Sequence, residues 1–177
     1  MPCECVSVLS VVADCFAVVI GLCAVVVSLA SLISQRKYNR NSVRPILNIV
    51  VGDYLNDIYV RIENKGVGPA VITSTCCEYK FADGKCFEEE VLYELIDSIG
   101  ISGTRIECYT DFVENIKNRT ISQKESVTLM EVSDKLLTEE VKKGLRMILK
   151  DVTITVEYEN VYRDKFTCRR ELTFFGR

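Results

Sequence analysis

Histidine is absent from the 177-residue chain, as is tryptophan. Without histidine, Ser-His-Asp and Cys-His catalysis, Cys₂His₂ zinc sites and histidine pH switches are all excluded. No recognised catalytic motif takes their place. An excess of positive charge is lacking too, because the net charge is -3, so we expect no binding to bulk nucleic acid. We therefore predict a protein that is not an enzyme and that holds no metal or other cofactor.

The nine cysteines include no C-x-x-C pair. Their spacings match no zinc ribbon or knuckle, and neighbouring residues on a strand point to opposite faces. An odd number of thiols is typical of a reducing compartment, so we expect ordinary buried thiols in the second part of the chain. These cysteines are Cys76, Cys77, Cys86, Cys108 and Cys168.

Charge is almost missing from residues 6–33, where 22 of 28 residues are hydrophobic and Asp14 is the single charged one. A bilayer core requires about 20 apolar residues. No Lys or Arg precedes the run, as one would before the core of a cleavable signal peptide. The sequence therefore predicts one transmembrane helix, which together with a short N-terminus occupies residues 1–34.

Basic residues directly follow this apolar run. Because Lys and Arg stay on the cytoplasmic side of a membrane, the N-terminus is expected outside and the rest of the chain in the cytosol. We predict a single-pass protein of a bacterial inner membrane, with a basic juxtamembrane linker (35–43) and a cytosolic domain (44–177). The basic residues are Arg36, Lys37, Arg40 and Arg44.

Small and polar residues repeat along one face of the predicted helix at heptad spacing, with bulky apolar residues at most positions between them. Small residues let two membrane helices approach closely, so we predict self-association through this face. For Asp14 three roles are open: it lines a cation pathway, bridges helices while protonated, or lies at the headgroup level. The face comprises Ser7, Ser10, Asp14, Ala17, Gly21, Ala24, Ser28, Ser31 and Gln35.

From residue 44 onward the hydrophobic period changes to two, which indicates strands. We predict a mainly β domain, an antiparallel β-sandwich or small barrel carrying about two helices. Strands are expected over 46–51, 58–63, 70–81, 127–132, 152–159 and 166–175, with a hairpin turn at 82–85. One helix is expected over 88–98, begun by a glutamate run, and another from Ser133 or Thr138 to Lys150. Residues 106–121 favour strand and loop over helix.

Both ends of this domain resemble a group of small bacterial membrane-anchored proteins of unassigned function. The matching segments are Arg44-Pro45-Ile46-Leu47, the run from Ile58 to Ala70, and the run from Val156 to Phe166, which follow the pattern RPxL…IxVxIxNxGVGPA…VEYxxxYxxKF. The resemblance implies a membrane anchor and a sandwich-like cytosolic domain, and the middle of the chain departs from it. Arg163 stands where the group usually has Gly. Such architectures also look like effectors of bacterial antiviral defence that perturb the membrane.

Basic residues form two clusters, one on the second predicted helix and one on the last predicted hairpin. One interpretation is a solvated helix face and an edge strand protected by charge. The other is a site for a small anionic ligand, such as a cyclic oligonucleotide, or for anionic lipid heads. The residues are Lys142, Lys143, Arg146 and Lys150 on the helix, and Arg163, Lys165, Arg169 and Arg170 on the hairpin.

Gly66-Val67-Gly68 follows a predicted strand but leads to another strand, whereas a phosphate loop leads to a helix. We interpret it as a turn in which glycine supplies positive φ. Three functions then stand in order. The first is a self-associating membrane protein whose cytosolic domain senses a ligand or partner, as an antiviral effector would. A non-conducting adaptor or scaffold is the second, and a membrane-tethered hydrolase the third.

Overall fold

A computed structural model describes residues 3–81, 86–99, 111–112, 115–133 and 138–176. The chain divides into two compact units, Met1–Ser42 and Val43–Arg177. The first is a single helix and the second is the β-rich domain. The predicted class is confirmed: an apolar N-terminal helix precedes antiparallel sheets with added helices.

Helix α1 (Cys3–Ser42) contains one glycine and no proline, and it ends three residues before Pro45, which cannot continue a helix. Its segment Phe16–Ser42 is long and apolar enough to cross a membrane, and none of that segment is buried. Residues 35–42, which the sequence predicts as a linker, are the last turns of this helix.

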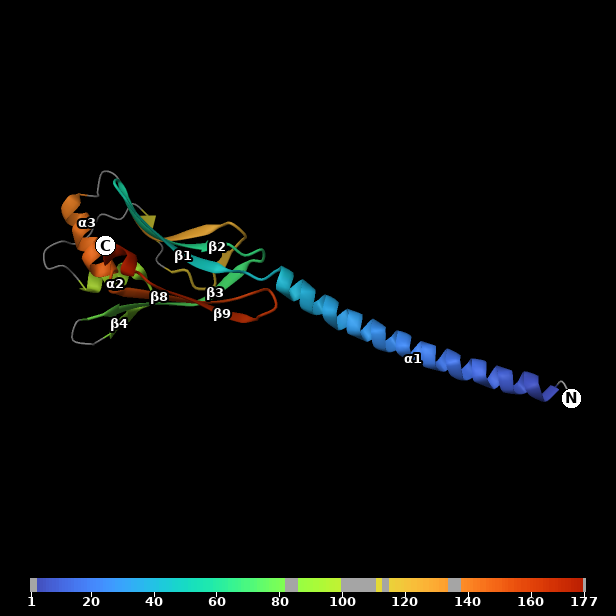
Figure 1. The fold of residues 1–177 in the computed structure, drawn as a ribbon. Coiled ribbons are helices and arrows are strands. Elements are labelled where there is room, and N and C mark those ends of the chain that lie inside the picture. The colour runs from blue at the N-terminus through green and yellow to red at the C-terminus, as the bar shows by residue number, and fades with distance from the viewer. Residues whose placement is uncertain (1–2, 82–85, 100–110, 113–114, 134–137, 177) are drawn as a thin grey trace. The chain divides into compact units, whose positions relative to one another are not determined.

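The domain consists of two antiparallel sheets (Figure 1). In the first, the strands are ordered β1 (Leu47–Tyr54), β2 (Asp57–Asn64), β7 (Ser126–Ser133) and β5 (Asp111–Phe112). In the second, they are ordered β4 (Cys86–Glu89), β3 (Ala70–Lys80), β8 (Val152–Glu159) and β9 (Lys165–Glu171), and β6 (Thr120–Ile121) also pairs with β3.

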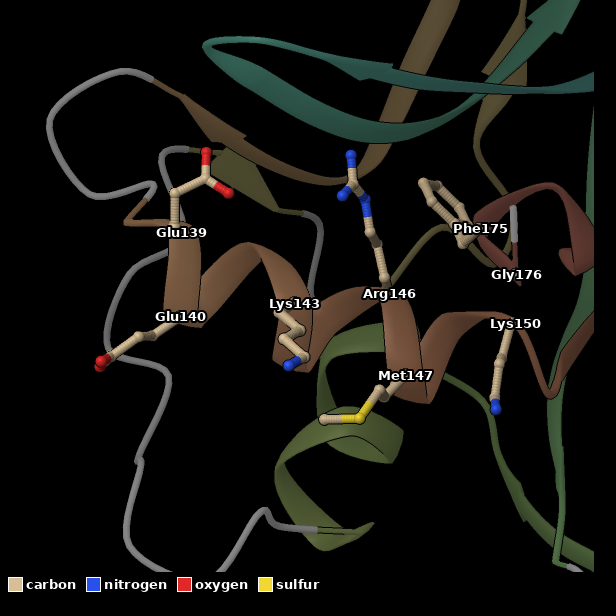
Figure 2. Close-up of a pocket in the computed structure, with 8 residues that line it drawn as sticks. All are labelled: Glu139, Glu140, Lys143, Arg146, Met147, Lys150, Phe175 and Gly176. Carbon is tan, nitrogen blue, oxygen red and sulfur yellow. The ribbon is translucent and has the colours of Figure 1, made fainter.

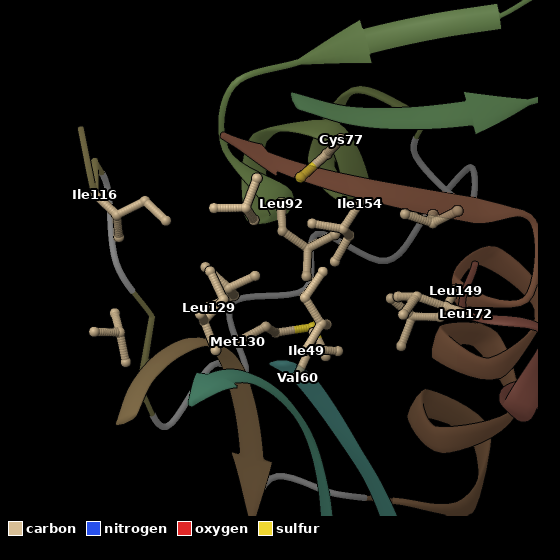
Figure 3. Packing of buried hydrophobic residues seen from close by; sticks show 14 of the residues in the cluster. Ile49, Val60, Cys77, Leu92, Ile116, Leu129, Met130, Leu149, Ile154 and Leu172 are labelled. Carbon is tan, nitrogen blue, oxygen red and sulfur yellow. The ribbon is translucent and has the colours of Figure 1, made fainter. Parts of the chain in front are cut away.

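Side chains that alternate along the central strands form the core between the sheets (Figure 3). On β8 the predicted inward residues Val152, Ile154, Val156 and Tyr158 are all buried. Met130 of β7 is fully buried with them. Each large apolar side chain that leaves water in this way contributes about 1.5–3 kcal/mol to folding.

Three short helices close one end of the core. They are α2 (Leu92–Ile99), α3 (Glu139–Leu149) and the 3-10 helix η1 (Thr173–Gly176). The Thr138 hydroxyl accepts a hydrogen bond from the Val141 amide at 3.3 Å, so Thr138 is the N-cap of α3. The apolar face predicted for α2 is confirmed, since Leu92, Leu95 and Ile96 are buried.

Two predicted boundaries are wrong. Glu88 and Glu89 belong to strand β4, opposite Glu78 and Cys77 of β3, and not to a helix. Pairing with the sheet therefore outweighs the preference of a glutamate run for a helix start. The last strand ends at Glu171, where the chain turns into η1. The predicted turn at 82–85 lies outside the described residues.

Candidate functional site

The two innermost cations of the predicted helix cluster are paired within the domain. Lys142 is 5% exposed, and its Nζ donates to the carbonyl oxygens of Tyr54 at 2.5 Å and Leu55 at 3.3 Å. Arg146 donates through Nε and Nη2 to the two carboxylate oxygens of Asp53, at 2.7 and 2.8 Å. That hydrogen bond raises the pKa of Arg146. The pairs fasten α3 to the turn between β1 and β2.

The other two cations of this helix line a surface pocket of about 560 Å³. Figure 2 shows Arg146 directed toward the strands, while Lys143 and Lys150 point away from them. Glu139 and Glu140 line the same pocket, and their carboxylates oppose an anion. Lys150 also borders a second hollow of about 620 Å³, beside Asp151 and Glu171. The helix cluster therefore offers a bound anion two exposed cations among carboxylates.

The hairpin cluster is spread over both faces of β9. Arg169 is exposed and lies 3.6 Å from the Glu78 carboxylate. Arg170 points to the opposite face, where its guanidinium donates to the carbonyl oxygen of Ile49 on β1. Lys165 and Arg163 lie at the other end of the strand from η1, which contacts α3. Six residue steps of strand span about 20 Å, so the structure does not bring the two predicted clusters together.

Asn64 organises the end of the domain that carries Val43, the residue directly after α1; we name this the proximal end. The side chain is fully buried, although it is polar. Its Oδ1 accepts from the amides of Ile46 at 3.3 Å and Gly66 at 2.9 Å. Its Nδ2 donates to the carbonyl oxygens of Gly68 at 2.8 Å and Ile121 at 3.0 Å. One side chain thus ties together β1, the β2–β3 turn and β6.

The two glycines of this turn are required by close packing, which corrects the interpretation from sequence. Neither has a positive φ. A Cβ at Gly66 would lie 2.3 Å from the amide nitrogen of Ile46, and a Cβ at Gly68 would lie 1.8 Å from the carbonyl oxygen of Val43. The turn joins the two sheets and lies against the first residues of the domain. Any side chain at these positions would displace that backbone.

Asn160 organises the neighbouring β8–β9 turn in the same manner. Its Oδ1 accepts from the amides of Tyr162 and Asp164, both at 2.9 Å, and the residue is 3% exposed. Arg163 in this turn has a φ of 62°. That left-handed conformation suits glycine, so the backbone accounts for the Gly that the resembling proteins have there. Sequence reasoning missed both asparagines, whose signal was an Asn at the end of a strand before a turn.

Along α1, the small-residue face has no neighbour among the described residues. A Cβ added at Gly21 would meet nothing within 4 Å. The Ser28 and Ser31 hydroxyls donate to the carbonyl oxygens of Ala24 and Val27 of the same helix, each at 2.8 Å. Asp14 and the other predicted positions from Ala17 to Gln35 are exposed, and the side chains of Ser7 and Ser10 lie outside the description.

The described cysteines differ in environment. Cys77 is buried, and desolvation raises the pKa of its thiol to about 12. Cys76, on the opposite face of β3, and Cys168 are half-buried, whereas Cys86 is exposed. The expectation of buried thiols is therefore wrong for Cys86. In the described part of the chain, no group of three or more Cys, Asp or Glu side chains gathers as metal ligands would.

Comparison with known proteins leaves the function open. Neither a protein-family model nor a curated protein sequence matches the chain. Function is therefore inferred from the residues and their geometry.

Proposed function

We propose that this chain is a self-associating, single-pass membrane protein that holds its β-sandwich domain at the cytosolic face of a bacterial inner membrane. The observation that carries the proposal is the exposure of α1, whose segment Phe16–Ser42 is long and apolar enough to span a bilayer and has no part buried. Each large apolar side chain left in water forfeits about 1.5–3 kcal/mol. A bilayer removes this surface from water, and helix–helix contact covers part of it.

Self-association is supported by the pattern on α1. Gly21 has open space around it, so no contact within the chain accounts for its lack of a side chain. Ser28 and Ser31 satisfy their hydroxyls on their own helix and therefore present small surfaces to a neighbour. Close approach of small residues is what stabilises helix pairs in lipid.

The domain would act by binding and not by catalysis. A membrane-perturbing effector of antiviral defence that senses a ligand or partner is the first form of this proposal, and a non-conducting adaptor is the second. For a small anionic ligand, only Lys143 and Lys150 of the helix cluster extend away from the domain. Ion flux through membranes that contain the protein distinguishes the two forms, because an adaptor leaves conductance unchanged.

Self-association is tested by crosslinking the full-length protein in nanodiscs. The double variant Gly21→Leu, Ala24→Leu should lose the oligomer, because two bulky side chains separate the helix backbones. The matched control is Val19→Leu, Val26→Leu, which adds the same side chain on the opposite face of the heptad pattern and should keep the oligomer. A monomeric wild type, or an oligomer that survives the Gly21 and Ala24 changes, contradicts the proposed interface.

The orientation is tested by labelling intact cells with a membrane-impermeant maleimide, followed by mass spectrometry. Cys86 is exposed on the domain, so it should react only after lysis. Cys3 and Cys5, at the start of the chain, should react in intact cells. Labelling of Cys86 before lysis would place the domain outside.

A further inference from the structure

The turns at the proximal end of the domain carry five exposed cations. Register places these turns together, because Leu47 pairs with Asn64 in one sheet and Val71 pairs with Glu159 in the other. The Leu47 amide also donates to the Tyr158 hydroxyl at 3.4 Å, which joins the two sheets at this end. The cations are Arg44, Lys65, Lys124, Arg163 and Lys165.

The carboxylates of this end are half-buried and engaged. Glu63 lies 3.6 Å from the Lys65 ammonium, and Glu125 accepts from the Ser122 amide at 2.8 Å. Asp164 accepts from Asn160 Nδ2 at 2.9 Å. The cations are therefore the outermost charges of the proximal end, although the whole chain has a net charge of -3.

Exposed apolar side chains stand between these cations. Ile46 is 54% exposed, Val67 60%, Val161 57% and Tyr162 47%. Val67 is at the tip of the β2–β3 turn, and Val161 and Tyr162 are at the tip of the β8–β9 turn. Apolar and aromatic tips beside Lys and Arg are the composition that lies well at a membrane–water interface.

Both turns are held rigidly, so that presenting these tips to a partner costs little conformational entropy. Asn64 and Asn160 each fix one turn through buried side-chain hydrogen bonds. Arg44 is held too, with its guanidinium carbon 4.9 Å from the centroid of the Phe166 ring.

We propose that the proximal end is a docking surface for an anionic lipid bilayer: its cations bind lipid phosphates, and Val67, Val161 and Tyr162 enter the headgroup region. The inference rests on the proposed function, in that α1 supplies the tether. Val43 follows α1 directly, and residues 34–42 are helical. Nine residues of helix span about 14 Å, so the proximal end stays within reach of the headgroups beside the apolar run. Nucleic acid fits less well, because it offers the apolar tips nothing to enter.

The test is photo-crosslinking of the full-length protein in liposomes of neutral phosphatidylcholine or of phosphatidylcholine with phosphatidylglycerol. The photoreactive residue p-benzoylphenylalanine replaces Val161 at the proximal end or, as the matched control, Met147 on α3, which is 50% exposed. Mass spectrometry counts lipid adducts. We expect at least tenfold more adduct at position 161 in the anionic liposomes than in the neutral ones, and background adduct at position 147 in both.

A charge variant tests the cause of docking. Lys124→Gly, Arg163→Gly and Lys165→Gln remove three cations, and the two glycines relieve positive φ angles of 62°, so loss of folding does not explain the result. Each cation near an anionic surface favours docking about fivefold, so the triple variant should lower the docked-to-free ratio roughly a hundredfold. Lys80→Gln, Lys143→Gln and Lys150→Gln, which remove three exposed cations elsewhere on the domain, should leave the adduct unchanged.

Flotation of the same samples separates this inference from the proposed function. Protein that floats with both kinds of liposome is inserted through α1, and adduct at position 161 then decides the docking. Inserted protein without more adduct at 161 than at 147 overturns the inference and leaves the anchor standing. Flotation with anionic liposomes alone supports the docking surface and overturns the anchor, and flotation with neither overturns both.

Discussion

Replacing Asn64 by alanine should destabilise the domain far more than a small polar residue usually does. The substitution removes one buried side chain and leaves four backbone groups without their partner. These are the amides of Ile46 and Gly66 and the carbonyl oxygens of Gly68 and Ile121. The bond to Ile46 is the longest and is half-buried, so water replaces it at little cost.

The size of the effect follows from the three groups that stay buried. A buried polar group left without a hydrogen bond costs about 1–3 kcal/mol. Local relaxation recovers part of this, so we expect Asn64→Ala to lower the free energy of unfolding by about 3–5 kcal/mol, a large share of the 5–15 kcal/mol typical of a domain. Asn64→Asp has nearly the same volume but turns an oxygen toward two carbonyl oxygens, so it should cost at least as much.

The assay is urea unfolding of the full-length protein in detergent, followed by tyrosine fluorescence. Seven of the eight tyrosines lie after residue 42, so the signal reports on the domain. The matched control is Asn48→Ala, at a half-buried position of β1. If Asn64→Ala and Asn48→Ala shift the midpoint equally, or if Asn64→Asp is as stable as the wild type, the hydrogen-bond reasoning is refuted.

Three further predictions concern other contacts and use the same unfolding assay. Gly68→Ala should cost about 2–3 kcal/mol by displacing backbone, whereas Gly176→Ala, whose Cβ would lie 3.6 Å from its nearest neighbour, should be nearly neutral; equal shifts would contradict the close approach at Gly68. Asp53→Asn should cost about 2–4 kcal/mol because it leaves Lys142 buried without its carboxylate, while Arg169→Gln, which breaks an exposed pair, should cost under about 0.5 kcal/mol. The thiol of Cys77 keeps its proton to about pH 12 in the folded state, against an ordinary pKa of 9.0. Because the unfolded chain releases that proton first, stability should fall as pH rises from 9 toward 12, and Cys77→Val should flatten this part of the profile; an unchanged slope would show that the thiol does not contribute.

Local patterns were sufficient to predict much of the fold. Alternation of apolar and polar residues identified β2 and β8, because successive side chains of a strand point to opposite faces and one face must leave water. Helical spacing identified the buried face of α2, and Thr138 marked the start of α3. These signals are carried by neighbours in the chain, so no knowledge of the tertiary structure is needed to recognise them.

The roles of the polar residues could not be predicted in this way. Arg146 and Asp53 are 93 residues apart in sequence, and their pairing converts half of a predicted ligand cluster into a fastening of α3 to β1. Asn64 reads as an ordinary turn residue until the fold brings Ile121 beside it. A charge or an amide has no direction in a sequence, and its partner is decided by what the sheets place opposite.

By itself, the sequence determined that an apolar helix precedes a separate β-rich domain, because hydrophobic run length and period are local properties of the chain. The tertiary structure alone decided which cations stay outermost. It buried Lys142 against a turn and set Arg163 and Lys165 beside the apolar tip of Val161, at the end of the domain that follows α1. The physical reason is that charge acts through distance and burial, and folding sets both.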